Sequence, residues 1–183
     1  MLLITIPSSE DELWDERNGQ FITLENDQVL ELEHSLISLS TWESKWCKPF
    51  ISKEHKTVEE TIDYIRCMTL TKDVDPNAYF FITDDNIEKI NRYIQAPMTA
   101  TWFSEEKNGK VNPEQVTTEL IYWWMIALDI PLECEAWPFN RLITLIKICN
   151  IKNQPAKKLS SREILSRNAQ LNEARKKRWN TKG

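Results

Sequence analysis

The side chains that could do acid–base or nucleophilic chemistry are few and scattered along the chain. There are two histidines, His34 within an expected helix and His55 in a lysine-flanked loop. Neither has a cysteine or aspartate at the spacing of a catalytic motif, so we expect surface roles for both. The three glycines, at positions 19, 109 and 183, cannot build a phosphate-cradling loop or a nucleophile elbow. The pattern predicts a protein that is not an enzyme, with no catalytic residues and no cofactor.

Patterns for metal binding and paired carboxylates are also weak. The cysteines are widely spaced and form no C-x-x-C pair, which predicts free thiols and no metal site: Cys47, Cys67, Cys134 and Cys149. Four acidic residues gather around a short apolar hairpin: Glu119, Asp129, Glu133 and Glu135. A carboxylate pair acting as acid and base is conceivable there. Solvated charges at the rim of the hairpin are the favoured interpretation.

Tryptophan is frequent, with eight residues in a chain of 183. Trp42 and Trp46 lie about one helical turn apart, Trp123 and Trp124 point about 100° apart on a helix, and Trp137 precedes a proline. Core packing is the simpler interpretation. A partner groove is the alternative, because tryptophan is enriched at binding hot spots. These five tryptophans are therefore candidate partner-binding residues.

The net charge of −5 hides an acidic body and a basic tail. Residues 1–146 carry 12 basic and 26 acidic side chains, a net charge of −14, whereas residues 147–183 carry 11 basic and 2 acidic, a net charge of +9. The candidate binding residues of the tail are Arg175, Lys176, Lys177 and Arg178. They could grip phosphates while Trp179 stacks on a base, pair with an acidic body of the same or a neighbouring chain, or remain solvated. The acidic body opposes nucleic acid, so pairing with an acidic body is favoured.

The periodicity of apolar residues predicts a mainly α-helical α+β fold. β-prone runs begin the chain, and the second and third are expected to pair as a small N-terminal β-hairpin: Leu2–Ile6, Phe21–Leu24 and Val29–Leu32. The segment between the first two runs is polar and turn-rich. Helices are expected over 33–47, from Thr57 with a capping box to Glu60, and from a cap at Thr83 or Asp84. A short strand pair is expected at 99–103 and 110–112.

A helical hairpin is expected over residues 119–149. Its first part, Leu120–Leu128, is apolar at nine consecutive positions, too few to span a bilayer. We expect that helix to begin at Pro113 with Asn112 as its cap, and to be covered on every side. The second helix, Phe139–Cys149, has one polar stripe. The tryptophan pair of the first helix is either core or part of a groove.

The chain is expected to form one compact domain, residues 1–150, followed by a basic linker and a C-terminal helix, residues 151–183. That helix is expected to start at Ser160, with Glu163 closing a capping box. The first residues have no basic segment before a short apolar run, so we expect no signal peptide and a cytoplasmic protein without a membrane span.

Several segments of the chain resemble the tail assembly chaperones of long-tailed bacteriophages, in particular a group from phages and prophages of Gram-positive hosts. The similarity is carried by LENDQVLELEHSLISLSTWESKWCKPF at 24–50, DYIRCMTL at 63–70, PMTATWF at 97–103, ELIYWWMIALDIP at 119–131 and the ending 148–183.

The resemblance implies a non-enzymatic protein of the host cytoplasm. Such chaperones coat the long helical tape measure protein while tail tube subunits polymerise around it, and they tend to self-associate. The alternatives are a nucleic-acid-binding or regulatory phage protein acting through residues 157–179, and a phage protein recognised by or acting on a host defence protein.

Overall fold

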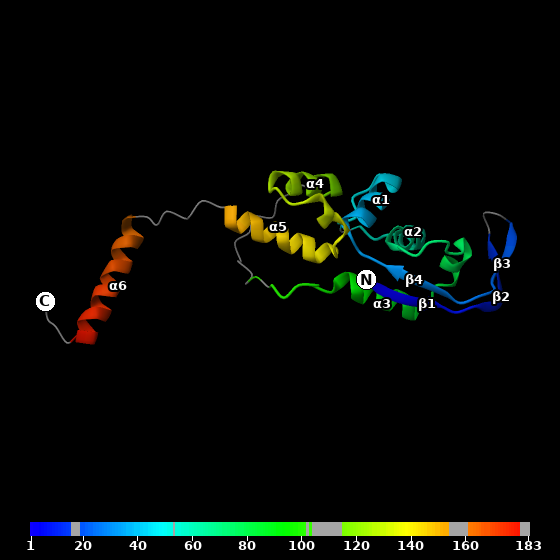
Figure 1. Cartoon of the computed structure of the whole chain (residues 1–183), viewed down its shortest axis with the longest axis horizontal. Helices are drawn as coiled ribbons and strands as arrows, with labels where there is room; N and C mark the ends of the chain where they lie inside the picture. Colours follow the sequence, from blue (N-terminus) through cyan, green and yellow to red (C-terminus); the bar gives the residue numbers. More distant parts are fainter. Residues whose placement is uncertain (16–18, 53, 102, 104–114, 154–160, 180–183) are drawn as a thin grey trace. The chain divides into compact units, whose positions relative to one another are not determined.

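A computed structural model describes residues 1–15, 19–52, 54–101, 103, 115–153 and 161–179 (Figure 1). The chain divides into two compact units, Met1–Cys149 and Asn150–Gly183. The strands are β1 (Leu2–Ile6), β2 (Ser9–Asp15), β3 (Gln20–Leu24) and β4 (Gln28–Leu32). The helices are α1 (Leu36–Trp46), α2 (Val58–Met68), α3 (Asp84–Gln95), α4 (Thr118–Ala127), α5 (Phe139–Asn153) and α6 (Ser161–Trp179), with short 3-10 helices η1 (Pro76–Phe81) and η2 (Leu132–Ala136). This confirms the mainly helical α+β fold.

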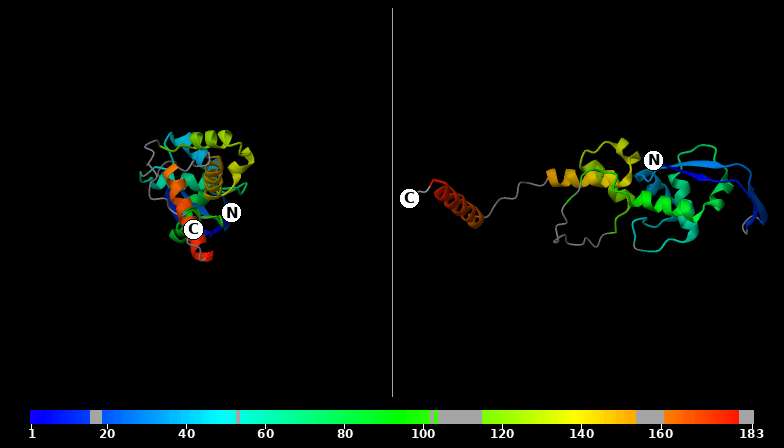
Figure 2. Two further views of the ribbon diagram at one scale, coloured as in Figure 1. Left: turned by 90° about the vertical axis from the view of Figure 1, so that its left-hand side faces the viewer. Right: turned by 90° about the horizontal axis from the view of Figure 1, so that it is seen from below.

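The four strands form a two-stranded ribbon in two parts. β1 pairs antiparallel with β4, from Leu2 opposite Leu32 to Ile6 opposite Gln28. β2 pairs antiparallel with β3, and the register shifts between Ser9 and Leu13. The ribbon changes direction where the two parts meet (Figure 2), and there the Ser8 amide donates a hydrogen bond of 2.7 Å to the Asp27 carboxylate. That bond holds the pKa of Asp27 below its ordinary value.

The predicted pairing of the hairpin is wrong, although the expected runs are strands. The run after residue 20 pairs with β2, and the run ending at Leu32 pairs with β1. The acidic composition of β2 predicts a polar turn rather than a strand, because Glu and Asp have low strand propensity. In a two-stranded ribbon one face remains in water, and there the acidic residues are tolerated.

The outer edges of the β1–β4 part are bonded to the helical layer. Leu70 donates to the Glu31 carbonyl at 2.7 Å, and Glu33 donates to the Met68 carbonyl at 2.9 Å. On the other edge, the Asn86 side chain donates to the Thr5 carbonyl at 3.1 Å. These bonds attach the ends of α2 and α3 to the ribbon and satisfy backbone groups that an isolated ribbon would leave to water.

The starts of α2 and α3 follow the sequence signals. The Thr57 hydroxyl accepts from the Glu60 amide, and the Glu60 carboxylate accepts from the Thr57 amide, which is the predicted capping box. Thr83, one of the two expected caps, begins α3. α1 starts later than expected, because Ser35 caps it in a reciprocal pair with Ser38.

α4 differs most from its expected form. It begins at Thr118 with Thr117 as its cap, so Pro113 does not start it and Asn112, which lies outside the described residues, is not its cap. Ile121 and Met125 are buried, but Trp123 is 61% exposed and Ile126 is 67% exposed. The expectation that this apolar helix is covered on every side is therefore wrong. The expected strand at 99–103 is not formed in its described residues, and 110–112 lie outside them.

One core joins the ribbon to the helices of the Met1–Cys149 unit. α1 packs against α2, α4 and η2, and α3 packs against β1. The most deeply buried side chains come from every layer: Ile6, Leu30, Leu36, Leu39, Trp42, Ile65, Met68, Ile121 and Leu142. α6 starts at Ser161, one residue after the expected start. Among the described residues no helix is both long and apolar enough to cross a membrane.

Candidate partner-binding groove

A groove of about 570 Å³ runs along the outer side of α2. Trp14 of β2, Trp46 of α1 and Phe80 of η1 contribute its aromatic walls, and Val58 and Ile62 of α2 contribute its aliphatic floor. Val58 is 81% exposed, and Trp14 and Phe80 are about half exposed. A groove of this size that presents apolar side chains to water has the character of a partner or ligand site. We call these five residues and the charged rim described next the α2 groove.

The rim of the α2 groove carries equal numbers of positive and negative charges. Lys45 and Arg66 are the cations, and Glu59 and Asp63 are the anions. Lys45 forms an ion pair with the largely buried Asp63. The Arg66 guanidinium lies 5.0 Å from the centre of the Tyr79 ring, a distance that suits a cation–π contact. The groove therefore selects by shape and apolar contact more than by net charge.

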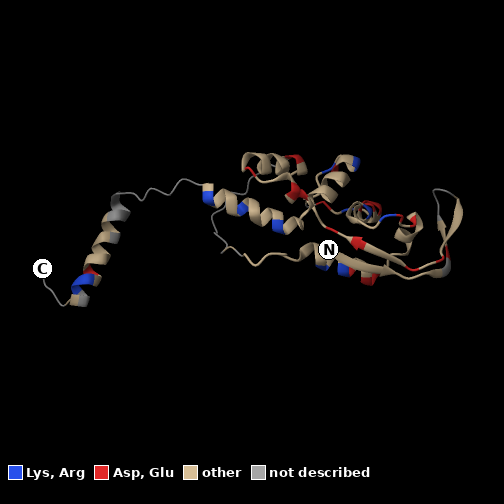
Figure 3. Cartoon of the chain, in the orientation of Figure 1, with Lys and Arg blue, Asp and Glu red and all other residues tan. Residues whose placement is uncertain are grey.

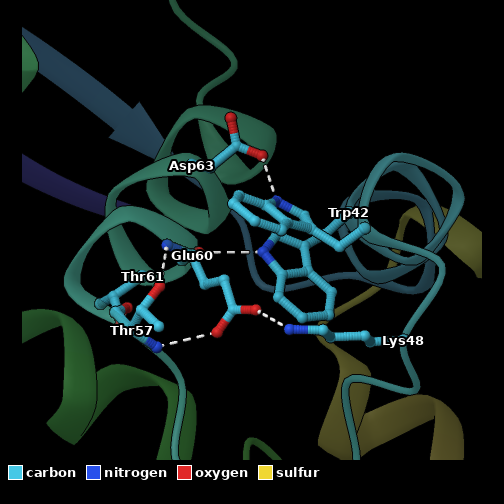
Figure 4. Close-up of polar contacts among 7 residues, drawn as sticks. Trp42, Lys48, Thr57, Glu60, Thr61 and Asp63 are labelled. Carbon is cyan, nitrogen blue, oxygen red and sulfur yellow. Dashed lines mark hydrogen bonds and ion pairs between the residues drawn. The ribbon is translucent and has the colours of Figure 1, made fainter.

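Hydrogen bonds to α2 hold the indoles of Trp42 and Trp46; Figure 4 labels Trp42 and the acceptor residues Glu60 and Asp63. The Trp46 indole N–H donates to the Asp63 carboxylate at 2.8 Å, and the Trp42 indole N–H donates to the Glu60 carbonyl at 2.9 Å. The two indoles are stacked with ring centres 6.1 Å apart. The hydrogen bond at the polar end of the Trp46 indole restrains its orientation, so that its apolar surface lines the groove.

Lys48, which follows the end of α1, forms an ion pair with Glu60 of α2 (Figure 4). Their ion pair spans 2.6 Å. The hydrogen bond from Lys48 and the bond from the Thr57 amide hold the pKa of Glu60 below its ordinary value. In turn the Glu60 carboxylate raises the pKa of Lys48. Both groups are thus charged together across the neutral pH range.

The five candidate tryptophans of the body have different environments. Trp42 is 1% exposed and belongs to the core, so it offers no surface to a partner. Trp46 lines the α2 groove. Trp123 is exposed on α4, and Trp124 is half-buried against the core. Trp137 is half-buried, and the Arg141 guanidinium lies 4.1 Å from the centre of its ring. The five residues therefore do not form one surface: only Trp46 lines the groove, and only Trp123 is largely exposed.

The basic candidates lie near the end of α6. Arg175 and Lys176 are exposed. Lys177 and Arg178 fall within the same helix, but their side chains are outside the part of the chain that the structure describes. Trp179 at the end of α6 is exposed.

Sequence reasoning missed most of the α2 groove. The spacing of Val58, Ile62 and Ile65 predicts one apolar stripe facing the core, but only Ile65 is fully buried. Trp14 lies in the segment expected to be a turn. The signal in the sequence is Val58, the first apolar position of this stripe, which is also the first helical residue and is exposed.

His34 is buried, so its expected surface role is wrong. Its Nδ1 lies 2.5 Å from the Tyr64 hydroxyl, and its ring packs edge-on against Phe139 at 5.4 Å. The Tyr64 hydroxyl is also 3.3 Å from Ser38 Oγ. Burial lowers the pKa of His34 to about 4, because the charged imidazolium would lose its hydration. His55 is exposed in its loop.

Acid is expected to destabilise the protein through His34. A histidine whose folded pKa lies near 4 and whose unfolded pKa lies near 6.5 binds more protons when unfolded. Stability is therefore complete above the unfolded pKa and is lost as the pH falls through this window. Between pH 7 and pH 4.5 the loss from this group is about 2 kcal/mol. Urea unfolding at both pH values measures it.

The matched variants are His34→Gln and His55→Gln. The first is expected to remove about 2 kcal/mol of the pH dependence, and the second, at the exposed histidine, to leave it unchanged. Equal pH dependence in wild type and His34→Gln would contradict the assignment of the window to His34.

Reactive thiols and metal ligands do not gather in the described residues. Cys47, Cys67, Cys134 and Cys149 are free thiols. Burial raises the pKa of Cys67 to about 11 and also raises that of Cys134, which makes both poor nucleophiles. Within the described ranges no three His, Cys, Asp or Glu side chains are placed to share a metal ion. Glu135 accepts a 2.8 Å hydrogen bond from the Tyr122 hydroxyl.

The α2 groove thus combines the hydrogen-bonded Trp46 indole with exposed apolar side chains and a balanced set of charges. No protein-family model, no curated protein and no solved structure matches this chain.

Proposed function

We propose that this protein is a non-enzymatic tail assembly chaperone of a long-tailed bacteriophage, which binds the tape measure protein in the host cytoplasm. The proposal joins the sequence resemblance to one structural observation, the α2 groove with its fixed Trp46 and its exposed Val58 and Phe80. A long helical client presents apolar side chains along one face, and such a face docks into an apolar groove by the i, i+3, i+4 pattern.

The balance of the groove suits a chaperone that must later be removed. Its apolar lining supplies binding energy, and the charged rim adds little net attraction. A groove of this volume accommodates only a few client side chains at once. Each contact with the client is thus weak, and many copies along a long client would be displaced one at a time by tail tube subunits. Self-association of the chaperone and contact with the tail tube protein belong to the same proposal.

Co-expression with the proposed client, the tape measure protein, tests the proposal. Wild-type protein is expected to increase the soluble fraction of the client several-fold and to co-purify with it. Val58→Glu is expected to reduce co-purification about tenfold, because it places a charge on the apolar floor of the groove. Val58 is 81% exposed, so the substitution leaves the fold intact.

Ile126→Glu on α4 is the matched control, since Ile126 is also exposed, at 67%, and aliphatic. Its co-purification is expected to equal that of wild type. If Ile126→Glu abolishes binding and Val58→Glu does not, the client binds α4 and not the α2 groove. Failure of the wild-type protein to solubilise the client would overturn the chaperone function itself.

A further inference from the structure

The charges of this chain are divided between its two units. The Met1–Cys149 unit has 13 basic and 26 acidic side chains, a net charge of −13, and residues 150–183 have 10 basic and 2 acidic, a net charge of +8. Almost half of the excess negative charge lies in the β2–β3 part of the ribbon and its flanks, where residues 9–27 contain seven acidic side chains and one basic. Figure 3 shows acidic positions along the ribbon and basic positions on α6.

The β2–β3 hairpin also exposes aromatic surface. Trp14 and Phe21 face each other across the two strands with ring centres 5.0 Å apart in an edge-on pair. Both are more than half exposed. Glu12 and Glu25 are exposed on the same part of the ribbon. The hairpin thus combines an aromatic pair with several carboxylates, which suits a basic, amphipathic partner.

α6 has the complementary composition. Its described apolar side chains Leu165, Leu171 and Trp179 are exposed, and Arg175 and Lys176 are exposed beside them. A helix of 19 residues with so little burial gains its stability from a partner rather than from intrinsic propensity. What it offers to such a partner is positive charge together with a few large apolar side chains.

We infer that α6 of one copy docks on the acidic β2–β3 hairpin of a second copy. A second copy is the proposed partner, because within the Met1–Cys149 unit α5 lies at the end opposite to the β2–β3 hairpin in Figure 1. Such a contact joins two different surfaces, tail to hairpin, and is therefore heterologous: it closes into a ring or continues as an open chain. The contact gives a site to the self-association in the proposed function, and it shares Trp14 with the α2 groove, but it needs no client to be observed.

Sedimentation velocity of the full-length protein over a range of micromolar concentrations tests the contact. The expected result is a mass that increases with concentration at 50 mM NaCl and an association constant that falls at least tenfold by 500 mM, since salt screens exposed charge pairs. A mass that stays monomeric at every concentration in low salt would overturn the proposal, as would assembly that ignores salt.

Two charge-reversed variants identify the surfaces. Arg175→Glu with Lys176→Glu reverses the tail, and Glu12→Lys with Glu25→Lys reverses the hairpin. Each variant alone is expected to remain monomeric, and an equimolar mixture of the two is expected to assemble again. Recovery on mixing shows that both proteins are folded and that the tail of one chain meets the hairpin of another.

A control variant separates this contact from general charge effects. Glu88→Lys with Glu133→Lys changes the net charge of the body as much as the hairpin variant does, at two exposed sites outside the β2–β3 hairpin, and is expected to assemble like wild type. Loss of assembly in this control, or no recovery in the mixture, would overturn the proposed docking. So would a duplex DNA oligonucleotide that the tail binds more tightly than it binds a second copy at physiological salt.

Discussion

Replacing Trp42 with alanine is expected to lower the free energy of unfolding by about 3–5 kcal/mol, the range for a large aromatic residue removed from a core. Trp42 is 1% exposed and packs edge-on against Phe50 with ring centres 5.1 Å apart. Its indole N–H also satisfies the Glu60 carbonyl. Alanine would leave a cavity between α1 and α2 and would remove the indole hydrogen bond, two separate costs.

Urea unfolding followed by circular dichroism measures this loss without relying on tryptophan fluorescence, which the substitution itself changes. Trp123→Ala is the matched control, because the same substitution is made at an indole that is 61% exposed. Its expected cost is below about 1 kcal/mol. Similar costs for the two variants would show that Trp42 does not belong to the core described here. Trp42→Phe should recover part of the packing but not the hydrogen bond.

Replacing Glu43 with alanine is expected to cost about 3–5 kcal/mol, although this residue is charged and carries no ion pair among the described contacts. Its carboxylate is buried and accepts three hydrogen bonds, from the Thr118 amide at 2.8 Å, the Thr118 hydroxyl at 2.6 Å and the Phe50 amide at 2.7 Å. A carboxylate at a helix N-terminus is stabilised by the amides and by the helix dipole. Alanine would leave all three donors without an acceptor, at about 1–3 kcal/mol each when buried.

Glu88→Ala is the control for Glu43. Glu88 forms a fully exposed ion pair with Arg92 one helical turn away, worth at most about 0.5 kcal/mol. The cost of Glu43→Gln is expected to lie between those of the two alanine variants. Glutamine keeps the shape of the side chain, but its NH2 group replaces one carboxylate oxygen and cannot accept a hydrogen bond. Thermal unfolding of the four proteins gives the order. A cost for Glu43→Ala no larger than for Glu88→Ala would contradict the role of Glu43 as the buried acceptor for Thr118 and Phe50.

The sequence predicts those parts of the fold that depend on neighbouring residues. The capping box of Thr57 and Glu60 is local, and it is found as predicted. Glu43 shows the opposite case, because its partner Thr118 is 75 residues away. In the sequence Glu43 is an ordinary polar residue of a helix, and nothing near it indicates burial. Long-range contacts of this kind cannot be read from spacing.

The candidate site also combines local features, which the sequence predicts, with long-range contacts, which it does not. The spacing of Trp42 and Trp46 places both on α1, but periodicity alone cannot tell the buried Trp42 from Trp46, which lines the groove. Both lie on the same helical face, and the difference comes from which part of α2 and η1 lies opposite each one. The groove lining also includes Trp14 of β2, a strand whose acidic sequence does not predict a strand.

The two-part ribbon has a consequence for the order of folding. If β1 and β4 met first, they would close a loop containing residues 7–27, at the entropic cost of a long loop. Once β2 and β3 have paired, only Pro7 and Ser8 on one side and residues 25–27 on the other separate the two parts. We therefore expect the acidic hairpin to form before β1 joins β4. The segment that carries the proposed docking surface would then be in place before the core beneath it is complete.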